Sequence, residues 1–260
     1  MIGRYEAYID GVALTSINNN IIITDISHKP ASIQQKTARV ANRDGSRVVG
    51  SYADAASVGV KFLIREYDIL KRQEICQKIA QWATQGTYIT TNDRRWQKLR
   101  CVCEQTPTIE SSKNWTDEIT MTFKGYNPPY WQEINATKVT LGGTNGATSG
   151  NTSVHVLGNV KNTLIGAKIT AKASISTVYL AVNSKVIGLA GLSLSSGDVV
   201  TIDYDDDMNI RIKKGSTSLL GKRTAESADD LLVDCGKMNT FSFESSAAAV
   251  VEFTIRGWWM

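Results

Sequence analysis

The sequence predicts a mainly β protein of two β-sandwich domains, the first of which carries one packed α-helix. Three observations support this fold class. Short segments rich in β-branched residues recur along the chain and are separated by turn signals. Residues 68–85 break this pattern, because their apolar residues fall at helical spacing. From residue 152 onward, strand patterns recur without a clear helical pattern, which is typical of an antiparallel sandwich or jelly roll.

Two adjacent prolines mark the expected domain boundary. The chain has 260 residues, enough for one large β domain or for two domains of about 130 residues. Pro128 and Pro129 stop the strand pattern, since proline has no N–H for a strand ladder. We therefore place the domains at residues 1–130 and 131–260. The Gly-rich run at 142–153 is then a loop early in the second domain; alternatively, this run is itself the linker.

Strands account for most of the first domain. The expected strands are residues 5–14, interrupted by a turn at Asp10-Gly11, and then 21–26, 36–40, 58–64, 86–91, 99–105 and 115–124. A turn is expected at Asn42-Arg-Asp-Gly-Ser46, because Asp and Gly favour turn geometry. Ile119, Met121 and Phe123 alternate with polar residues, so these three side chains are expected to face the core.

The expected helix has both of its ends marked. Asp68 is the expected N-cap and Gly86 the expected C′ residue. The apolar stripe consists of Ile69, Cys76, Ile79, Ala80 and Ala83, and it is widened by Ile75 and Trp82. We expect this amphipathic helix to pack its apolar side on a sheet.

The second domain is expected to contain only short strands. These are residues 152–157, 167–173, 177–182, 185–188, 199–204, 209–213, 239–244 and 249–257. Asp229-Asp230 lie before Leu231-Leu232, which favours a turn that caps a helix. The two acids are less suited to a glycosidase pair, because adjacent residues on a strand point to opposite faces.

Composition excludes several functional classes. The net charge is a mild +4 with no run of five basic residues, so nucleic-acid binding is not expected. No window approaches the ~18 apolar residues of a membrane span, and the first residues lack a signal-peptide core. We expect the protein to be made in the cytoplasm of its host. The four cysteines do not have metal-ligand spacing, and we expect free thiols.

Catalytic and metal motifs are weak. The only histidines are His28 and His155, and the chain lacks a nucleophile elbow and a phosphate-binding loop. We expect no enzyme activity and no cofactor. The sharpest metal candidate is a calcium site formed by Asp203, Asp205, Asp206 and Asp207. It lacks the glycine and the bidentate glutamate of an EF-hand loop, so an exposed hairpin tip is the favoured interpretation.

Trp258 and Trp259 are two adjacent tryptophans, which is an unusual pair in this sequence. Strand alternation groups Trp259 with Phe253 and Ile255 facing inward, and places Trp258 on the other face. Exposed tryptophans stack on sugars, but tryptophan is also enriched at protein interfaces. Packing or an interface is the favoured role for both residues.

The order of these motifs resembles the siphophage distal tail protein (Dit) family over nearly the whole chain. The first half contributes Ile9-Asp-Gly-Val, the strand at 21–26, Asn42-Arg-Asp-Gly-Ser46, Val60-Lys-Phe, a helix ending near Trp82, Met121-Thr-Phe-Lys and Asn127-Pro-Pro-Tyr. The second half is similar to the galectin-like sandwich of that family. It contributes Gly158-Asn159, Gly197-Asp198 with Ile202-Asp203, Ser227-Ala-Asp-Asp-Leu-Leu232, Gly236 with Asn239, and Arg256-Gly-Trp-Trp259.

The resemblance implies a structural protein that forms a homohexameric ring at the tail tip of a phage virion. The first domains would form the ring and its channel. The ring would join the tail tube and the end of the tape-measure protein to hub, fibre or receptor-binding proteins. Candidate interface residues are Arg94, Arg95, Trp96, Trp258 and Trp259.

Two points qualify this expectation. Residues 92–98 are more basic than the acidic turn of the family, which changes the charge expected on the ring. The alternative function is a carbohydrate-binding adhesin that uses the second sandwich, although a host-surface glycan is the less favoured partner.

Overall fold

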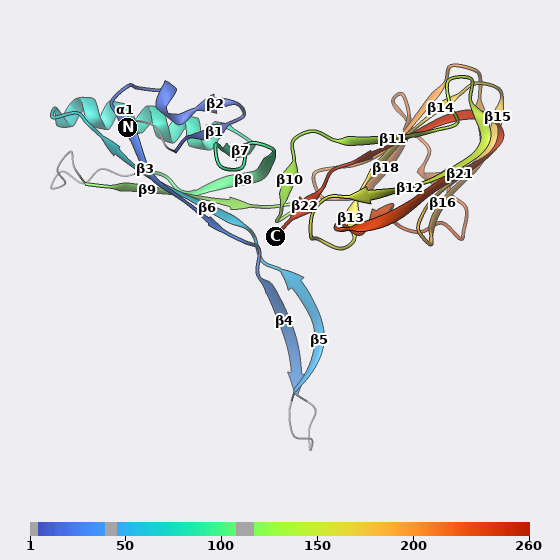
Figure 1. The fold of residues 1–260 in the computed structure, drawn as a ribbon, viewed down its shortest axis with the longest axis horizontal. Coiled ribbons are helices and arrows are strands. Elements are labelled where there is room, and N and C mark those ends of the chain that lie inside the picture. Colours follow the sequence, from blue (N-terminus) through green and yellow to red (C-terminus); the bar gives the residue numbers. More distant parts are fainter. Residues whose placement is uncertain (1–4, 40–45, 108–116) are drawn as a thin grey trace. The chain divides into compact units, whose positions relative to one another are not determined.

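The chain is mainly β, as predicted. The computed structural model describes residues 5–39, 46–107 and 117–260. It divides into two compact units, the first running to Gln132 and including Met260, the second spanning Glu133–Trp259 (Figure 1). In the described residues the predicted helix is the one α-helix, and β-strands form the rest of the regular structure apart from two short 3-10 turns.

Strand pairing in the first unit is antiparallel. Its strands are β1 (Ala7–Ile9), β2 (Val12–Ala13), β3 (Ile21–Lys29), β6 (Ser57–Ile64), β7 (Tyr88–Thr91), β8 (Gln97–Gln105) and β9 (Ile119–Gly125), with a 3-10 turn at Leu14–Ser16 and β10 (Trp131–Glu133) at its end. The strand order is β2-β1-β7-β8-β9-β6-β3. β8 pairs with β7 through its first half and with β9 through its second half, so it joins two leaves of the sheet.

Alternation of side chains builds the core of this unit. In β6, every second residue from Val58 to Ile64 is buried. β9 buries Ile119, Met121 and Phe123, which confirms the inward face predicted for that segment. The two strands pair with Val60 opposite Met121, so both rows of apolar side chains face the same side of the sheet.

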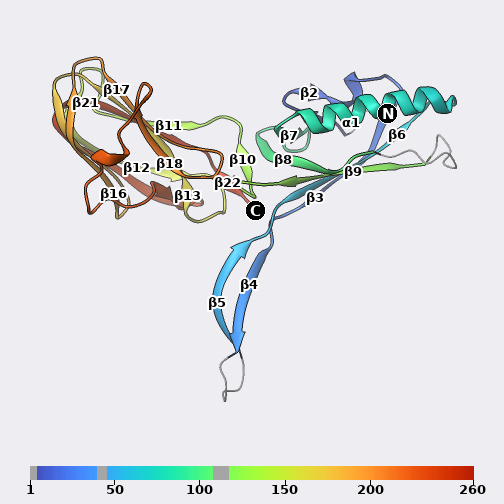
Figure 2. The same ribbon diagram turned by 180° about the vertical axis from the view of Figure 1, so that it is seen from behind.

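The helix α1 (Ile69–Gln85) begins and ends where the sequence predicts. Asp68 caps it, since its carboxylate accepts a hydrogen bond from the Leu70 amide at 2.9 Å. Its buried side includes Ile75 and Ile79, and both ribbon views place the helix along the sheet of β3, β6 and β9 (Figures 1 and 2).

Gly86 ends the helix for a different reason than a left-handed C′ residue. Its backbone is extended, with φ −97° and ψ 164°. A Cβ added at this position would lie 1.7 Å from Cγ2 of Ile9. Glycine is needed here because the chain passes directly against β1.

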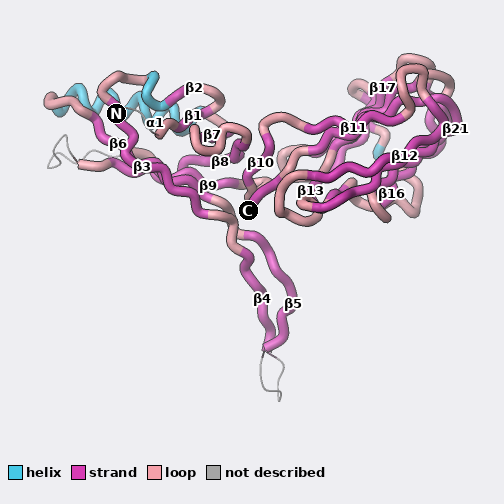
Figure 3. The backbone as a smooth tube through the Cα atoms, viewed as in Figure 1, coloured by secondary structure: helices cyan, strands magenta, loops and turns pink. Residues whose placement is uncertain are grey.

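A separate two-stranded hairpin interrupts the first unit between β3 and β6. Its strands are β4 (Ile33–Arg39) and β5 (Ser46–Ala53), and they pair only with each other among the described residues (Figure 3). β4 includes most of the strand expected at 36–40, whereas β5 was not predicted. The turn predicted at residues 42–46 lies outside the described residues except for Ser46.

The second unit is a sandwich built around one long strand. Its strands are β11 (Thr137–Leu141), β12 (Ala147–Val156), β13 (Thr163–Leu164), β14 (Gly166–Ala171), β15 (Ile175–Val182), β16 (Lys185–Leu194), β17 (Val199–Tyr204), β18 (Ile210–Lys214), β19 (Thr217–Ser218), β20 (Leu232–Val233), β21 (Lys237–Ile255) and β22 (Trp258–Trp259), with a 3-10 turn at Leu220–Lys222. The first part of β21 pairs with β12 and β15, and its last part pairs with β11 and β14. The strand therefore belongs to both leaves of the sandwich.

Three expectations for the second unit are wrong. The predicted strands at 239–244 and 249–257 are one strand, β21. The Gly-rich run is a loop only up to Gly146, because Ala147–Val156 forms β12, whose backbone pairs with β21. Asp229-Asp230 cap no helix; Leu231 is buried, and the next element is the short strand β20.

No helix in the described part of the chain is long and apolar enough to cross a membrane. All four cysteines are free thiols. Burial raises the pKa of the Cys101 thiol to about 12 and that of Cys76 to about 11, so both are protonated at neutral pH.

Candidate assembly surface

The β4–β5 hairpin presents apolar side chains to solvent. Ile33, Val48, Val49 and Tyr52 are each between 52% and 61% exposed, and we call these four side chains the hairpin surface. A two-stranded hairpin is marginally stable by itself, and its free edges are a template for pairing with another chain. Exposed apolar side chains on such an element make this hairpin a candidate assembly surface.

Charge on the hairpin is basic where the structure describes it. Lys36 and Arg47 are exposed, and the Lys36 ammonium lies 5.5 Å from the centre of the Tyr52 ring. Between Ile33 and Ala53 the sequence has four basic residues and a single acid. The surface that receives this hairpin is therefore expected to be apolar and acidic.

Sequence reasoning missed the hairpin surface, although a signal for it exists. The turn predicted at residues 42–46 lies between two segments of similar length, and the second of these contains the adjacent Val48 and Val49. A turn between equal, β-branched segments predicts a hairpin. What the sequence does not indicate is that the hairpin lacks a sheet to cover its apolar side chains.

The predicted interface residues of the β7–β8 turn divide into two groups. Arg94 is engaged within its own unit, because its guanidinium lies 4.9 Å from the centre of the Trp131 ring and donates to Oε1 of Gln97 at 3.2 Å. Arg95 and Trp96 are exposed. Of these basic-turn candidates, Arg95 and Trp96 are therefore accessible to a partner.

A histidine, His28, lies beside this turn and also contacts Trp131. Nε2 of His28 is 2.8 Å from Oδ2 of Asp93, and the imidazole makes an edge contact with the Trp131 ring at 5.3 Å. Nδ1 is buried and has no hydrogen-bond partner among the described residues. Burial lowers the pKa of His28, and nearby Arg94 lowers it further, against the opposing attraction of Asp93.

This histidine predicts a loss of stability in mild acid. Because the folded state lowers the imidazole pKa, its stabilising contribution is complete above the ordinary value of 6.5 and is lost as the pH falls below it. We expect the free energy of unfolding to fall more steeply between about pH 7 and pH 5 in the native chain than in His28→Gln, as measured by urea denaturation.

The other histidine provides the matched control. His155 is exposed on β12, and His155→Gln should retain the steep pH dependence. Titration of the Asp93 carboxyl does not contribute to the difference in pH dependence between the native chain and these variants. Burial would raise its pKa, but the hydrogen bond and the charge interaction with His28 help to lower it below its ordinary value, so Asp93 titrates below this window. Equal pH slopes in the native chain and His28→Gln would contradict the prediction.

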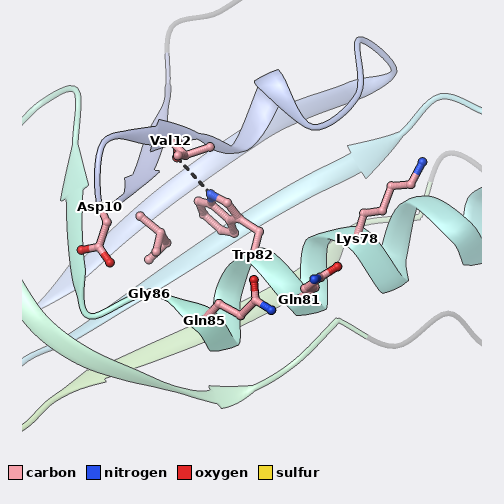
Figure 4. A pocket seen from close by; sticks show the side chains of 8 residues that line it. Asp10, Val12, Lys78, Gln81, Trp82, Gln85 and Gly86 are labelled. Carbon is pink, nitrogen blue, oxygen red and sulfur yellow. Dashed lines mark hydrogen bonds between the residues drawn. The ribbon is translucent and has the colours of Figure 1, made fainter.

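A pocket lies between the end of α1 and the β1–β2 turn (Figure 4). Its volume is about 360 Å³, and it is lined by Ile9, Asp10, Val12, Lys78, Gln81, Trp82, Gln85 and Gly86. The Trp82 indole N–H donates to the Val12 carbonyl at 2.9 Å. Asp10 accepts hydrogen bonds from the amides of Thr87 and Tyr88. The Asp10 carboxylate thus holds the turn.

The alternation predicted for the two terminal tryptophans is wrong. β21 ends at Ile255, and the chain bends at Gly257, where a Cβ would lie 2.6 Å from the Leu157 carbonyl oxygen. The bend changes which face each later residue occupies. Trp258 is 8% exposed, and its carbonyl accepts the Asn159 amide at 2.9 Å, whereas Trp259 is partly exposed. Trp258 therefore offers no open stacking face within this fold.

The four-aspartate segment forms the turn between β17 and β18. Asp203 pairs with Arg211 at 2.7 Å, and Asp205 accepts the amides of Asn209 and Asp207. These hydrogen bonds, with that from the Asn209 amide the strongest influence, lower the pKa of Asp205. In the described residues no three His, Cys, Asp or Glu side chains gather as metal ligands. Asp203 and Asp205 thus have structural partners in an exposed hairpin tip.

Comparison with known proteins finds similar structures but no similar sequences. No family model matches the chain, and no curated protein sequence matches it. The crystal structure of the SPP1 Dit (gp 19.1) protein matches with a TM-score of 0.70 at 13% identity, covering 98% of this chain and 99% of the other. A chain of the phage P2 baseplate in its activated conformation with calcium matches with a TM-score of 0.52 at 11% identity, covering 99% and 98%. Across nearly its whole length, this chain shares the fold of these two phage proteins.

Proposed function

We propose that this protein is a structural component of a phage tail tip and that its copies assemble into a hexameric ring. The hairpin surface is the observation that carries the proposal. It exposes apolar side chains on an element whose two edges are unpaired among the described residues, which is the form expected of an arm that another copy covers. The fold shared with SPP1 Dit, described as a paradigm of the hub adsorption apparatus in phages that infect Gram-positive bacteria, supports this function.

The hairpin favours a ring over a two-fold dimer. Its described charges are basic, so two hairpins would repel each other if they met face to face. A hairpin that contacts a different surface on the next copy makes a heterologous interface. Such an interface generates a closed ring when its rotation closes.

The ring would be a connector and not an enzyme. In this role it joins the tail tube and the end of the tape-measure protein to hub, fibre or receptor-binding proteins within the virion, after synthesis in the host bacterial cytoplasm. Arg95 and Trp96 are accessible for contacts of this kind. The alternative, a monomeric adhesin that binds sugar through Trp258, is weakened by the burial of that side chain.

Mass and shape in solution test the proposal. Light scattering of the purified full chain should give close to six times the 28.5 kDa chain mass, and negative-stain microscopy should show six-fold particles with a central hole. A monodisperse monomer at high protein concentration would overturn the ring.

A further inference from the structure

The second unit has a trough on the outer face of the leaf formed by β12, β21, β15 and β16. Strand register places Tyr179 between Glu244 and Gly188, and Ala181 between Ser242 and Val186. The residues that alternate with these, such as Leu180 and Ile187, are buried, so the trough faces away from the core. Its volume is about 310 Å³, and it is lined by Tyr179, Ala181, Val186, Ser242, Phe243 and Glu244. We call it the outer trough.

Small residues expose an aromatic ring in this trough. A Cβ at Gly188 would lie 2.7 Å from Cε1 of Tyr179, so the tyrosine ring occupies the space above the glycine. Ala181 and Ser242, on the neighbouring row, are too short to cover it. Tyr179 remains 40% exposed, and it is the aromatic side chain that lines the outer trough with part of its surface open to solvent.

The polar groups around the Tyr179 ring are a carboxylate, which accepts hydrogen bonds, and hydroxyl groups. The Glu244 carboxylate is opposite Tyr179 and exposed, and the Ser242 hydroxyl lies one row away. β12 continues the same face with Asn151, which pairs opposite Ser242, and Ser149, which pairs opposite Glu244. Neither Lys nor Arg lines the trough, so an anionic ligand has no counter-charge there.

We infer that the outer trough binds a neutral sugar. A pyranose ring has an apolar C–H face that suits the exposed tyrosine, and its hydroxyls are donors that suit the Glu244 carboxylate and the amide and hydroxyl groups of β12 and β21. An apolar peptide would leave the carboxylate without a partner. The site is separate from the hairpin surface and does not depend on ring formation.

The size of the trough sets the expected affinity. A volume of about 310 Å³ is at the lower end of the range for small-molecule sites, enough for a disaccharide. One aromatic contact and a few exposed hydrogen bonds give a dissociation constant on the order of 1 mM. Six such sites on one ring would add avidity toward a glycan surface.

Saturation-transfer NMR on the full chain, with lactose, cellobiose and chitobiose as probes, tests the inference. We expect transfer to the C–H protons of at least one of these disaccharides. Tyr179→Ala should weaken that binding about tenfold, because it removes the stacking face. Glu244→Gln should weaken it about threefold or more, because a charged acceptor becomes a neutral amide.

Matched substitutions elsewhere provide the controls. Tyr67→Ala removes an exposed tyrosine from the first unit, and Glu226→Gln neutralises an exposed carboxylate outside the trough; both should leave binding unchanged. No transfer to any of the three disaccharides, or equal binding by Tyr179→Ala and the native chain, would overturn the inference. Light scattering on the same samples reports ring formation separately, so a failure of either proposal is recognised independently.

Discussion

A Val49→Glu, Tyr52→Glu double variant is expected to remain folded and to lose the assembled state. Both side chains are exposed on the hairpin, so neither change removes core packing. In the ring the same positions would be covered, and each new carboxylate would be buried without a partner. Two such changes, one of them at an aromatic anchor, should weaken each contact between copies by at least about 100-fold.

Light scattering and circular dichroism together check this result. The double variant should have the monomer mass and the native far-ultraviolet spectrum. Leu220→Glu is the matched control, because it also places a carboxylate at an exposed apolar position but lies in the second unit. A double variant that still forms rings would show that the hairpin is not the contact between copies.

Lys36→Glu should weaken assembly as well if the receiving surface is acidic.

Local signals account for the parts of the fold that the sequence predicts correctly. The helix is marked by its apolar spacing and by the Asp68 cap, and both depend on neighbouring residues alone. Met121 and Phe123 alternate with threonines, which is sufficient to assign their inward face. These features require no knowledge of what the segment packs against.

The errors arise where a distant partner decides the structure. β12 consists largely of small polar residues with weak strand preference, and it is a strand because β21 pairs with it. β21 continues through Ser245-Ser-Ala-Ala248, a segment without a strand pattern, because strands on both leaves pair with its two ends. One bend at Gly257 is enough to exchange the faces expected for Trp258 and Trp259.

The candidate sites likewise combine features that local sequence signals predict with features that depend on distant parts of the chain. The hairpin could be predicted from its turn, but its exposure depends on the absence of a covering sheet among the described strands. The outer trough depends on Tyr179, Glu244 and Gly188, which come from three separate strands. No spacing in a single segment brings these residues together, so only the register of the sheet reveals them.

Phe253→Ala is expected to cost the second unit about 3–5 kcal/mol in free energy of unfolding. Phe253 is fully buried, and its ring centre lies 5.2 Å from that of Phe241. The two residues come from the two parts of β21, one in each leaf, so this contact packs the leaves together. The loss is a large fraction of the roughly 5–15 kcal/mol that stabilises a domain.

Urea denaturation of the full chain, followed by far-ultraviolet circular dichroism, measures this loss. Phe253→Leu is the conservative control, and because it leaves a smaller cavity it should cost less than half as much. Tyr179→Ala, on the outer face of the same sandwich, should change the free energy of unfolding by about 1 kcal/mol or less. A Phe253→Ala cost below about 1 kcal/mol would mean that β21 does not couple the two leaves, because the cavity would then have been filled by movement of one leaf relative to the other.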